Sequence, residues 1–77
     1  MKVKVIEVIG DGQTFDGQIE RSMTILGQFM DFRNVRTLTQ KVVLTDEQYL
    51  RYKDSVGKDV ELEVVPHTAK YGFQLAS

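Results

Sequence analysis

Cysteine and tryptophan are absent from the 77-residue chain, and proline and histidine occur once each. Without cysteine there is no disulfide and no thiolate ligand for a metal ion. The single histidine, His67, follows Pro66 in a predicted turn and cannot form a zinc site alone. We therefore expect no metal and no cofactor, and a fold that depends on its hydrophobic core.

Long apolar runs are also missing, since the longest, "VVL", has three residues. A membrane-spanning helix needs about 20. The start "MKVKVIEVIG" is basic but lacks the apolar stretch of a signal peptide. We expect a cytoplasmic protein that does not enter a membrane.

The chain has no strong excess of either charge, with ten Lys and Arg against eleven Asp and Glu and a net charge of −1. Proteins that neutralise phosphates usually have a basic balance, so the total disfavours nucleic acid. The charges are unevenly spread, however. Arg21, Arg33 and Arg36 precede five later acids, which are Asp46, Glu47, Asp59, Glu61 and Glu63. One face could be basic and another acidic, or the surface could be mixed and solvated.

Strand periodicity is the strongest pattern present, in an ordinary globular composition that predicts one domain over 1–77. "KVKVIEVI" alternates but slips in phase, which predicts a β-bulge near Val5 and Ile6 or burial on both faces. The alternation returns in "QIERSMTILGQF", "VRTLTQKVVLT", "GKDVELEVV" and "KYGFQLA". Before the second strand, Asp11-Gly12 or Asp16-Gly17 could form a type I′ hairpin turn.

One segment, "TDEQYLRYKDSVG", has helical signals instead. Thr45 and Gln48 fit a capping box, and acidic residues in the first turn favour the positive end of a helix. Gly57 fits a helix stop. These features predict a helix of about ten residues within 46–56.

The order of elements is therefore three strands, one helix and two strands. This order predicts a mainly β fold, a small five-stranded OB-like barrel with one short helix between strands 3 and 4. An SH3-like barrel or another small β-roll is the main alternative.

No catalytic motif stands out, because GxSxG, P-loop, HExxH and EF-hand patterns are all missing. Glu61 and Glu63 lie on the exposed side of a predicted strand, where they discourage aggregation rather than form an acid/base pair. We predict that the chain is not an enzyme.

Binding is the remaining class of function. OB folds bind through the face of strands 2 and 3 and the flanking loops, here 10–17 and 66–70. Aromatic rings stack on bases, and Arg and Lys contact phosphates. The predicted nucleic-acid contacts are Phe15, Arg21, Phe32, Arg33, Arg36, Lys41, Lys70 and Tyr71. Phe29 shares the parity of Met23 and Ile25 and is expected in the core. Arg21 interrupts that apolar parity, so it either leaves at a barrel rim or faces a partner.

Two segments resemble a known family. "GKDVELEVVPHTAKYGFQLAS" is similar to the last hairpin of the small single-stranded DNA-binding proteins of bacteriophages, and "RNVRTLTQKVVL" resembles their basic hairpin. The resemblance covers about half of the chain. It implies an OB-fold dimer that coats single strands without sequence preference, with Arg33, Arg36, Lys41 and Tyr71 in contact with DNA.

The sequence thus predicts a non-catalytic homodimer that binds single-stranded DNA or RNA largely independently of sequence. The alternative is a small phage- or plasmid-type interaction module, an inhibitor or assembly adaptor, that binds a protein through a strand edge or the acidic face 59–63. The near-neutral charge favours the alternative. Aromatic residues beside Arg33 and Arg36 favour nucleic acid.

Overall fold

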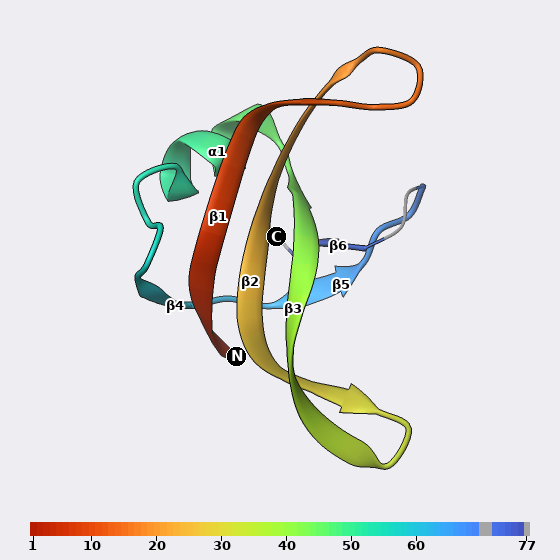
Figure 1. Cartoon of the computed structure of the whole chain (residues 1–77), viewed down its shortest axis with the longest axis vertical. Coiled ribbons are helices and arrows are strands. Elements are labelled where there is room, and N and C mark those ends of the chain that lie inside the picture. The colour runs from red at the N-terminus through yellow and green to blue at the C-terminus, as the bar shows by residue number, and fades with distance from the viewer. Residues whose placement is uncertain (70–71, 77) are drawn as a thin grey trace.

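The computed structural model describes residues 1–69 and 72–76, and it is mainly β with one short helix (Figure 1). Its elements are β1 (Lys2–Gln13), β2 (Ile19–Asp31), β3 (Asn34–Leu44), α1 (Asp46–Tyr52), β4 (Asp59–Glu61), β5 (Val64–Pro66) and β6 (Phe73–Leu75). Within the described residues, no helix is both long enough and apolar enough to cross a membrane.

The strands form a single curled sheet in the order β4-β1-β2-β3-β6-β5. β1, β2 and β3 are an antiparallel meander, and β6 runs parallel to β3. β4 and β5 lie at opposite edges of this sheet, although only Leu62 and Glu63 separate them. The sheet therefore bends round as a half-barrel, with the segment 59–66 crossing between its two edges (Figure 1).

The structure has six strands where the sequence predicts five. Val60, Leu62 and Val64 alternate without a break, but the backbone changes partner between them. The Leu62 N–H donates to the Met1 carbonyl at 2.9 Å, beside β1, whereas the Glu63 carbonyl accepts from the Ala76 N–H at 3.0 Å, beside β6. The predicted fourth strand is thus divided into β4 and β5.

The core lies on the concave face of the sheet. Its buried apolar side chains are Val3, Val5, Met23, Ile25, Val42, Leu44, Leu62 and Leu75. The phase slip in the first strand is a real irregularity, because the β1–β2 register shifts between Val5 and Glu7. The predicted bulge is confirmed at this point, and it lets Val5 and Val8 both face the core side.

The helix begins as the sequence predicts. The Gln48 N–H donates to Thr45 Oγ1 at 3.2 Å, and the Thr45 N–H donates to Gln48 Oε1 at 2.9 Å, which completes the capping box. The Tyr49 side chain packs the helix against β1. A Cβ added at Gly10 would lie only 2.5 Å from the Tyr49 hydroxyl oxygen. Only glycine at position 10 allows the ring to lie this close.

The predicted extent of the helix is wrong, since α1 ends at Tyr52 rather than near Val56. The following residues bond elsewhere. The Gly57 N–H donates to the Val5 carbonyl at 2.7 Å, and the Val5 N–H donates to the Lys58 carbonyl at 3.0 Å. Gly57 therefore serves the junction with β1 and not the helix stop.

The first hairpin turn uses Asp16-Gly17, whereas Asp11-Gly12 lies inside β1. The Gly17 N–H donates to the Thr14 carbonyl at 3.0 Å, and the Thr14 N–H donates to the Gln18 carbonyl at 2.8 Å. Within this loop only Gly17 has a positive φ, at 83°. The turn is therefore a three-residue loop, and the expected two-residue type I′ turn is wrong.

Candidate nucleic-acid interface

Two hairpins extend beyond the barrel-like part of the sheet. We call the end of β1–β2, residues 10–20, the upper arm and the end of β2–β3, residues 27–38, the lower arm. Their tips curve to the same side in Figure 1, toward β5 and β6. The longest extent of the molecule is 37 Å, and the view places that axis along the line from one arm to the other.

The upper arm ends in Phe15. Its side chain is fully exposed, as is usual for a loop tip but unusual for a phenylalanine. The neighbouring Thr14 hydroxyl donates to the Asp16 carboxylate and also accepts from the Gln18 N–H at 3.1 Å, so the loop is held from within. Phe15 is thus presented to solvent from an ordered turn.

The lower arm ends in Phe32, which is 98% exposed. Phe32 and Arg33 form a two-residue turn between the paired residues Asp31 and Asn34. Phe32 has φ 54°, the one positive φ among the non-glycine residues that the structure describes. A positive φ at the first turn position alone is the sign pattern of a type II′ turn, which normally carries glycine there. A bulky residue in this region costs about 1–2 kcal/mol, and such strain is typical of binding sites.

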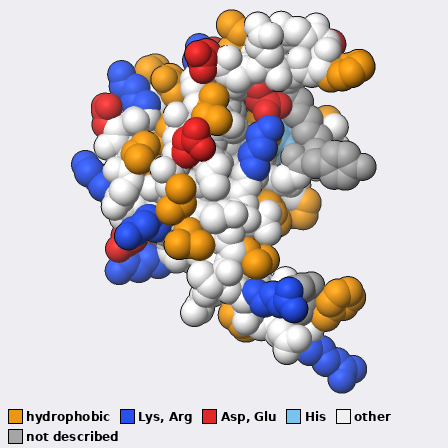
Figure 2. Space-filling view, viewed as in Figure 1, with side chains coloured by type: hydrophobic (Ala, Val, Ile, Leu, Met, Phe, Trp, Pro, Cys, Tyr) orange, Lys and Arg blue, Asp and Glu red, His pale blue; other side chains and the backbone are white. Residues whose placement is uncertain are grey.

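Two of the predicted nucleic-acid contacts lie near Phe32. Two further exposed side chains lie there that the sequence did not single out. Arg33 shares the turn, and Arg36 lies on the lower arm opposite Phe29, so both predicted basic residues reach this end. Met30 and Val35 pair directly across the arm and are 75% and 61% exposed. The sequence does contain a signal for them, because Met30 falls on the polar parity of its strand with Gln28. Basic and hydrophobic side chains therefore gather on the lower arm (Figure 2).

The lower arm is held to the body of the protein through Phe29. Its ring stacks on that of Phe73 in β6, with the ring centroids 6.0 Å apart and the planes at 28°. Phe29 is half-buried and packs against the core cluster, as its parity predicts. This contact orients the arm that carries the exposed tip.

The structure places two predicted contacts away from the tips. The Arg21 side chain lies beside the helix, with its Nε 2.9 Å from the Asp46 carboxylate and its guanidinium carbon 4.9 Å from the centre of the Tyr49 ring. Lys41 lies in the middle of β3 and forms an ion pair at 2.5 Å with Glu20, which is mostly buried. Arg21 is thus committed to the helix, whereas Lys41 stays half-exposed between the arms.

The remaining predicted contacts, Lys70 and Tyr71, lie outside the described residues. Of the loop that precedes them, His67 is described. Its Nδ1 accepts from the backbone N–H of Ala69 at 3.0 Å, and the backbone N–H of His67 donates to the Gly72 carbonyl at 3.1 Å. His67 therefore has a part in shaping the turn. In residues 1–69 and 72–76 no group of three metal-ligating side chains comes together.

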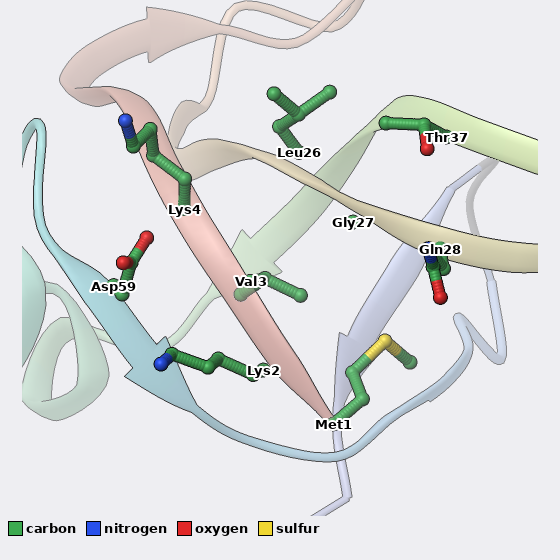
Figure 3. Close-up of a pocket in the computed structure, with 9 residues that line it drawn as sticks. All are labelled: Met1, Lys2, Val3, Lys4, Leu26, Gly27, Gln28, Thr37 and Asp59. Atoms are coloured by element: carbon green, nitrogen blue, oxygen red, sulfur yellow. The ribbon is translucent and has the colours of Figure 1, made fainter.

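A shallow groove of about 570 Å³ crosses the outer face of the sheet between β1 and the lower arm (Figure 3). Polar and basic side chains line most of it, including Lys2, Lys4, Gln28 and Thr37. Met1, Val3 and Leu26 add apolar side chains, and Asp59 lies at the β4 side. The groove is therefore open and of mixed polarity.

The negative charge of the acidic face 59–63 is largely offset by neighbouring basic groups. The β1–β4 register places Lys2 opposite Glu61 and Lys4 opposite Asp59. The Met1 amine lies 2.8 Å from Glu63 Oε1 and 3.2 Å from Glu61 Oε1. Hydrogen bonds to Glu63 and then to Glu61 raise the pKa of this amine above its usual value of 8.0. The face is therefore a mixed surface with basic groups beside each acid.

Comparison with models of protein families, with curated proteins and with solved structures finds no match to this chain.

Proposed function

We propose that the chain is an OB-like domain that binds single-stranded nucleic acid, largely independently of sequence. The topology supports the fold. If β4 and β5 are counted as one bent strand, the sheet has five strands, and that strand joins its two edges as closure of a barrel requires. The helix then lies between the third and fourth strands, the position predicted from the sequence.

The observation that carries the proposal is the exposed phenylalanine at the tip of each arm. Phe15 and Phe32 bury almost none of their surface, and neither supports the core. Planar rings at such positions can stack on unpaired bases, at about 1–3 kcal/mol per base and with little sequence preference. In a duplex the bases are already stacked, so this mode selects single strands.

The charges near the lower arm fit the same ligand. Arg33 and Arg36 lie beside Phe32, where they can contact the phosphates that flank a stacked base. Between the arms, the outer face of β2 and β3 presents Thr24, Thr37, Thr39 and Lys41. Few cations are involved, so the binding should be moderate and should weaken as salt is raised.

Fluorescence anisotropy would test this function, with a labelled single-stranded oligonucleotide and its duplex titrated at two salt concentrations. We expect binding to the single strand that weakens at the higher salt, and much weaker binding to the duplex. Equal affinity for both, or no binding at micromolar protein in low salt, would contradict the proposal.

A protein partner is the second candidate, and one observation favours it. Met30, Phe32 and Val35 form an exposed apolar group at the end of the lower arm, of the kind found in protein interfaces. The acidic face is a weaker candidate because Lys2, Lys4 and the Met1 amine offset it. If the chain binds no oligonucleotide, replacement of Met30 and Val35 by serine in a pull-down would test the apolar group.

A further inference from the structure

The lower arm has one backbone edge beside which no strand lies. β3 pairs with β2 along its whole length, but on its other side it pairs with β6 only at Val42 and Val43. Among the residues that the structure describes, no strand pairs with residues 35–39 on that side. We call this stretch the free edge. It lies between the Phe32 turn and β6, so its outward backbone groups are open to a ligand (Figure 1).

The register shows which backbone groups of the free edge point outward. Asp31 and Asn34 flank the two-residue turn, and such a pair exchanges both its N–H···O=C bonds. Asn34 and every second residue after it therefore direct their backbone groups at β2. Val35, Thr37 and Thr39 direct theirs outward.

The contact between β3 and β6 supports this assignment. Lys41 has the same parity as Thr37 and Thr39, and a Cβ added at Gly72 would lie only 3.0 Å from the Lys41 carbonyl oxygen. That carbonyl therefore points at β6, on the side where the free edge lies. Each outward residue of the free edge presents one N–H and one C=O, at a spacing of roughly 6.8 Å along the strand.

The free edge leaves little room for another strand. An added strand could pair over five residues only, because Phe73 of β6 already lies opposite Val42 and the Phe32 turn ends the arm on the other side. A ligand made of separate hydrogen-bonding units needs only one outward residue for each unit. The bases of a single strand are such units.

The side chains beside the free edge suit nucleic acid. The exposed Phe32 ring and Arg33 lie at its turn end. β3 contains two cations, Arg36 and Lys41, and no acidic residue. A single strand with one base stacked on Phe32 can therefore place its next nucleotides along the free edge, with its phosphates near basic groups.

From these observations we infer that unpaired bases hydrogen-bond to the free edge through their Watson–Crick edges. Proteins that bind single strands commonly contact this edge of a base. In every base it has a donor beside an acceptor, which the C=O and N–H of one outward residue can bind. The contact therefore needs little sequence preference, and a duplex cannot make it because its Watson–Crick edges are already paired. The inference rests on the proposed function and assigns base contacts to the backbone of β3.

Fluorescence anisotropy with two labelled oligothymidines tests the inference from the side of the ligand. One oligonucleotide has ordinary thymines. The other has thymines methylated at N3, which keeps the rings and the phosphates but blocks the Watson–Crick edge. We expect the methylated oligonucleotide to bind the wild type about tenfold more weakly, because several hydrogen bonds are lost. Equal affinity for the two would overturn the inference and leave the proposed function standing, whereas failure of both to bind would overturn both.

Thr37→Pro tests the same contact from the side of the protein, because proline removes one outward N–H and no hydrogen bond to β2. Thr37→Val is the matched control, since it keeps the N–H and loses only the hydroxyl. We expect Thr37→Pro to bind ordinary oligothymidine about two- to tenfold more weakly than Thr37→Val, and the methylated one equally well. Chemical denaturation checks that both variants fold. Equal affinity of the two folded variants for ordinary oligothymidine would overturn the inference.

Amide hydrogen exchange identifies the contacting groups without any substitution. The amides of Val35, Thr37 and Thr39 should exchange fast in the protein alone and become protected when oligothymidine binds. The amides of Leu38 and Gln40 face β2 and should be protected in both states, which makes them internal controls. Protection of the outward amides before oligothymidine is added would mean that a second copy covers the free edge. That result, or continued fast exchange in the complex, would overturn the inference.

Discussion

The guanidinium group of Arg21 lies over the ring of Tyr49, 4.9 Å from its centre, while its Nε bonds to the Asp46 carboxylate at 2.9 Å. Asp46 is the first residue of α1, and Tyr49 packs over Gly10 of β1. Arg21 in β2 thus holds both the start and the inner face of the helix against the sheet.

Replacement of Arg21 by alanine should therefore lower stability rather than ligand binding. We expect a loss of about 1 kcal/mol, because one partly exposed ion pair and one cation–π contact are removed. Chemical denaturation measures the loss, and Arg21→Lys should lose less because it keeps the charge. An Arg21→Ala variant of normal stability that binds oligonucleotide poorly would restore Arg21 as a ligand contact.

The capping box offers a second test of the same short helix. Thr45→Ala removes the hydroxyl that accepts the Gln48 N–H and should cost about 1 kcal/mol of unfolding free energy. Thr45→Ser keeps the acceptor and should be close to the wild type. If the alanine and serine variants melt at the same temperature, the cap does not stabilise the protein.

Local patterns in the sequence predict local structure well. The phase slip at Val5 predicts the bulge, and Thr45 with Gln48 predicts the helix start, because each depends on neighbours a few residues away. The end of the helix was missed because Gly57 bonds to Val5, fifty-two positions earlier in the chain. Uninterrupted alternation through Leu62 cannot show that the strand changes partner there.

The candidate site was also predicted only where neighbours in the sequence determine the position of a residue. Phe32 and Arg33 lie in a turn that the flanking strands make recognisable, and their exposure follows from that position. The role of Arg21 depends on a helix twenty-five residues away, which periodicity does not place. Met30 was missed because periodicity does not show that the end of the β2–β3 arm projects beyond the barrel, where Met30 stays exposed.

Stability should fall at mildly alkaline pH through the Met1 amine. Glu63 and Glu61 raise the pKa of this amine above 8.0 in the folded protein. A raised pKa stabilises the fold below pH 8.0, and the effect is lost as pH rises through the higher, folded value. Melting temperatures between neutral pH and the onset of Lys and Tyr titration should show the decline. Glu63→Gln should reduce it, and an equal decline in that variant would exclude the amine as its source.

The basic residues of the lower arm should set the salt dependence of binding. Affinity should fall less steeply with salt when Arg33 and Arg36 are replaced by alanine. The slope of log affinity against log salt concentration should decrease in magnitude by about 1–2, because up to two phosphate contacts are lost. Arg51→Ala with Lys53→Ala removes the same charge from the helix and is the matched control. Equal slopes for the two double variants would point to overall charge and away from contacts on the arm.

Phe32 allows stability and binding to be separated at one position. Its φ of 54° suits glycine, and its exposed ring contributes no burial. Phe32→Gly should therefore be more stable than Phe32→Ala by about 1 kcal/mol, because alanine keeps the strained φ. Both variants should lose about 1–3 kcal/mol of single-strand binding, the contribution of one stacked base, and Phe32→Trp should keep it. Denaturation and anisotropy measure the two effects separately. Wild-type affinity in the glycine variant would remove Phe32 from the interface, and equal stability of the glycine and alanine variants would mean that the turn is not strained.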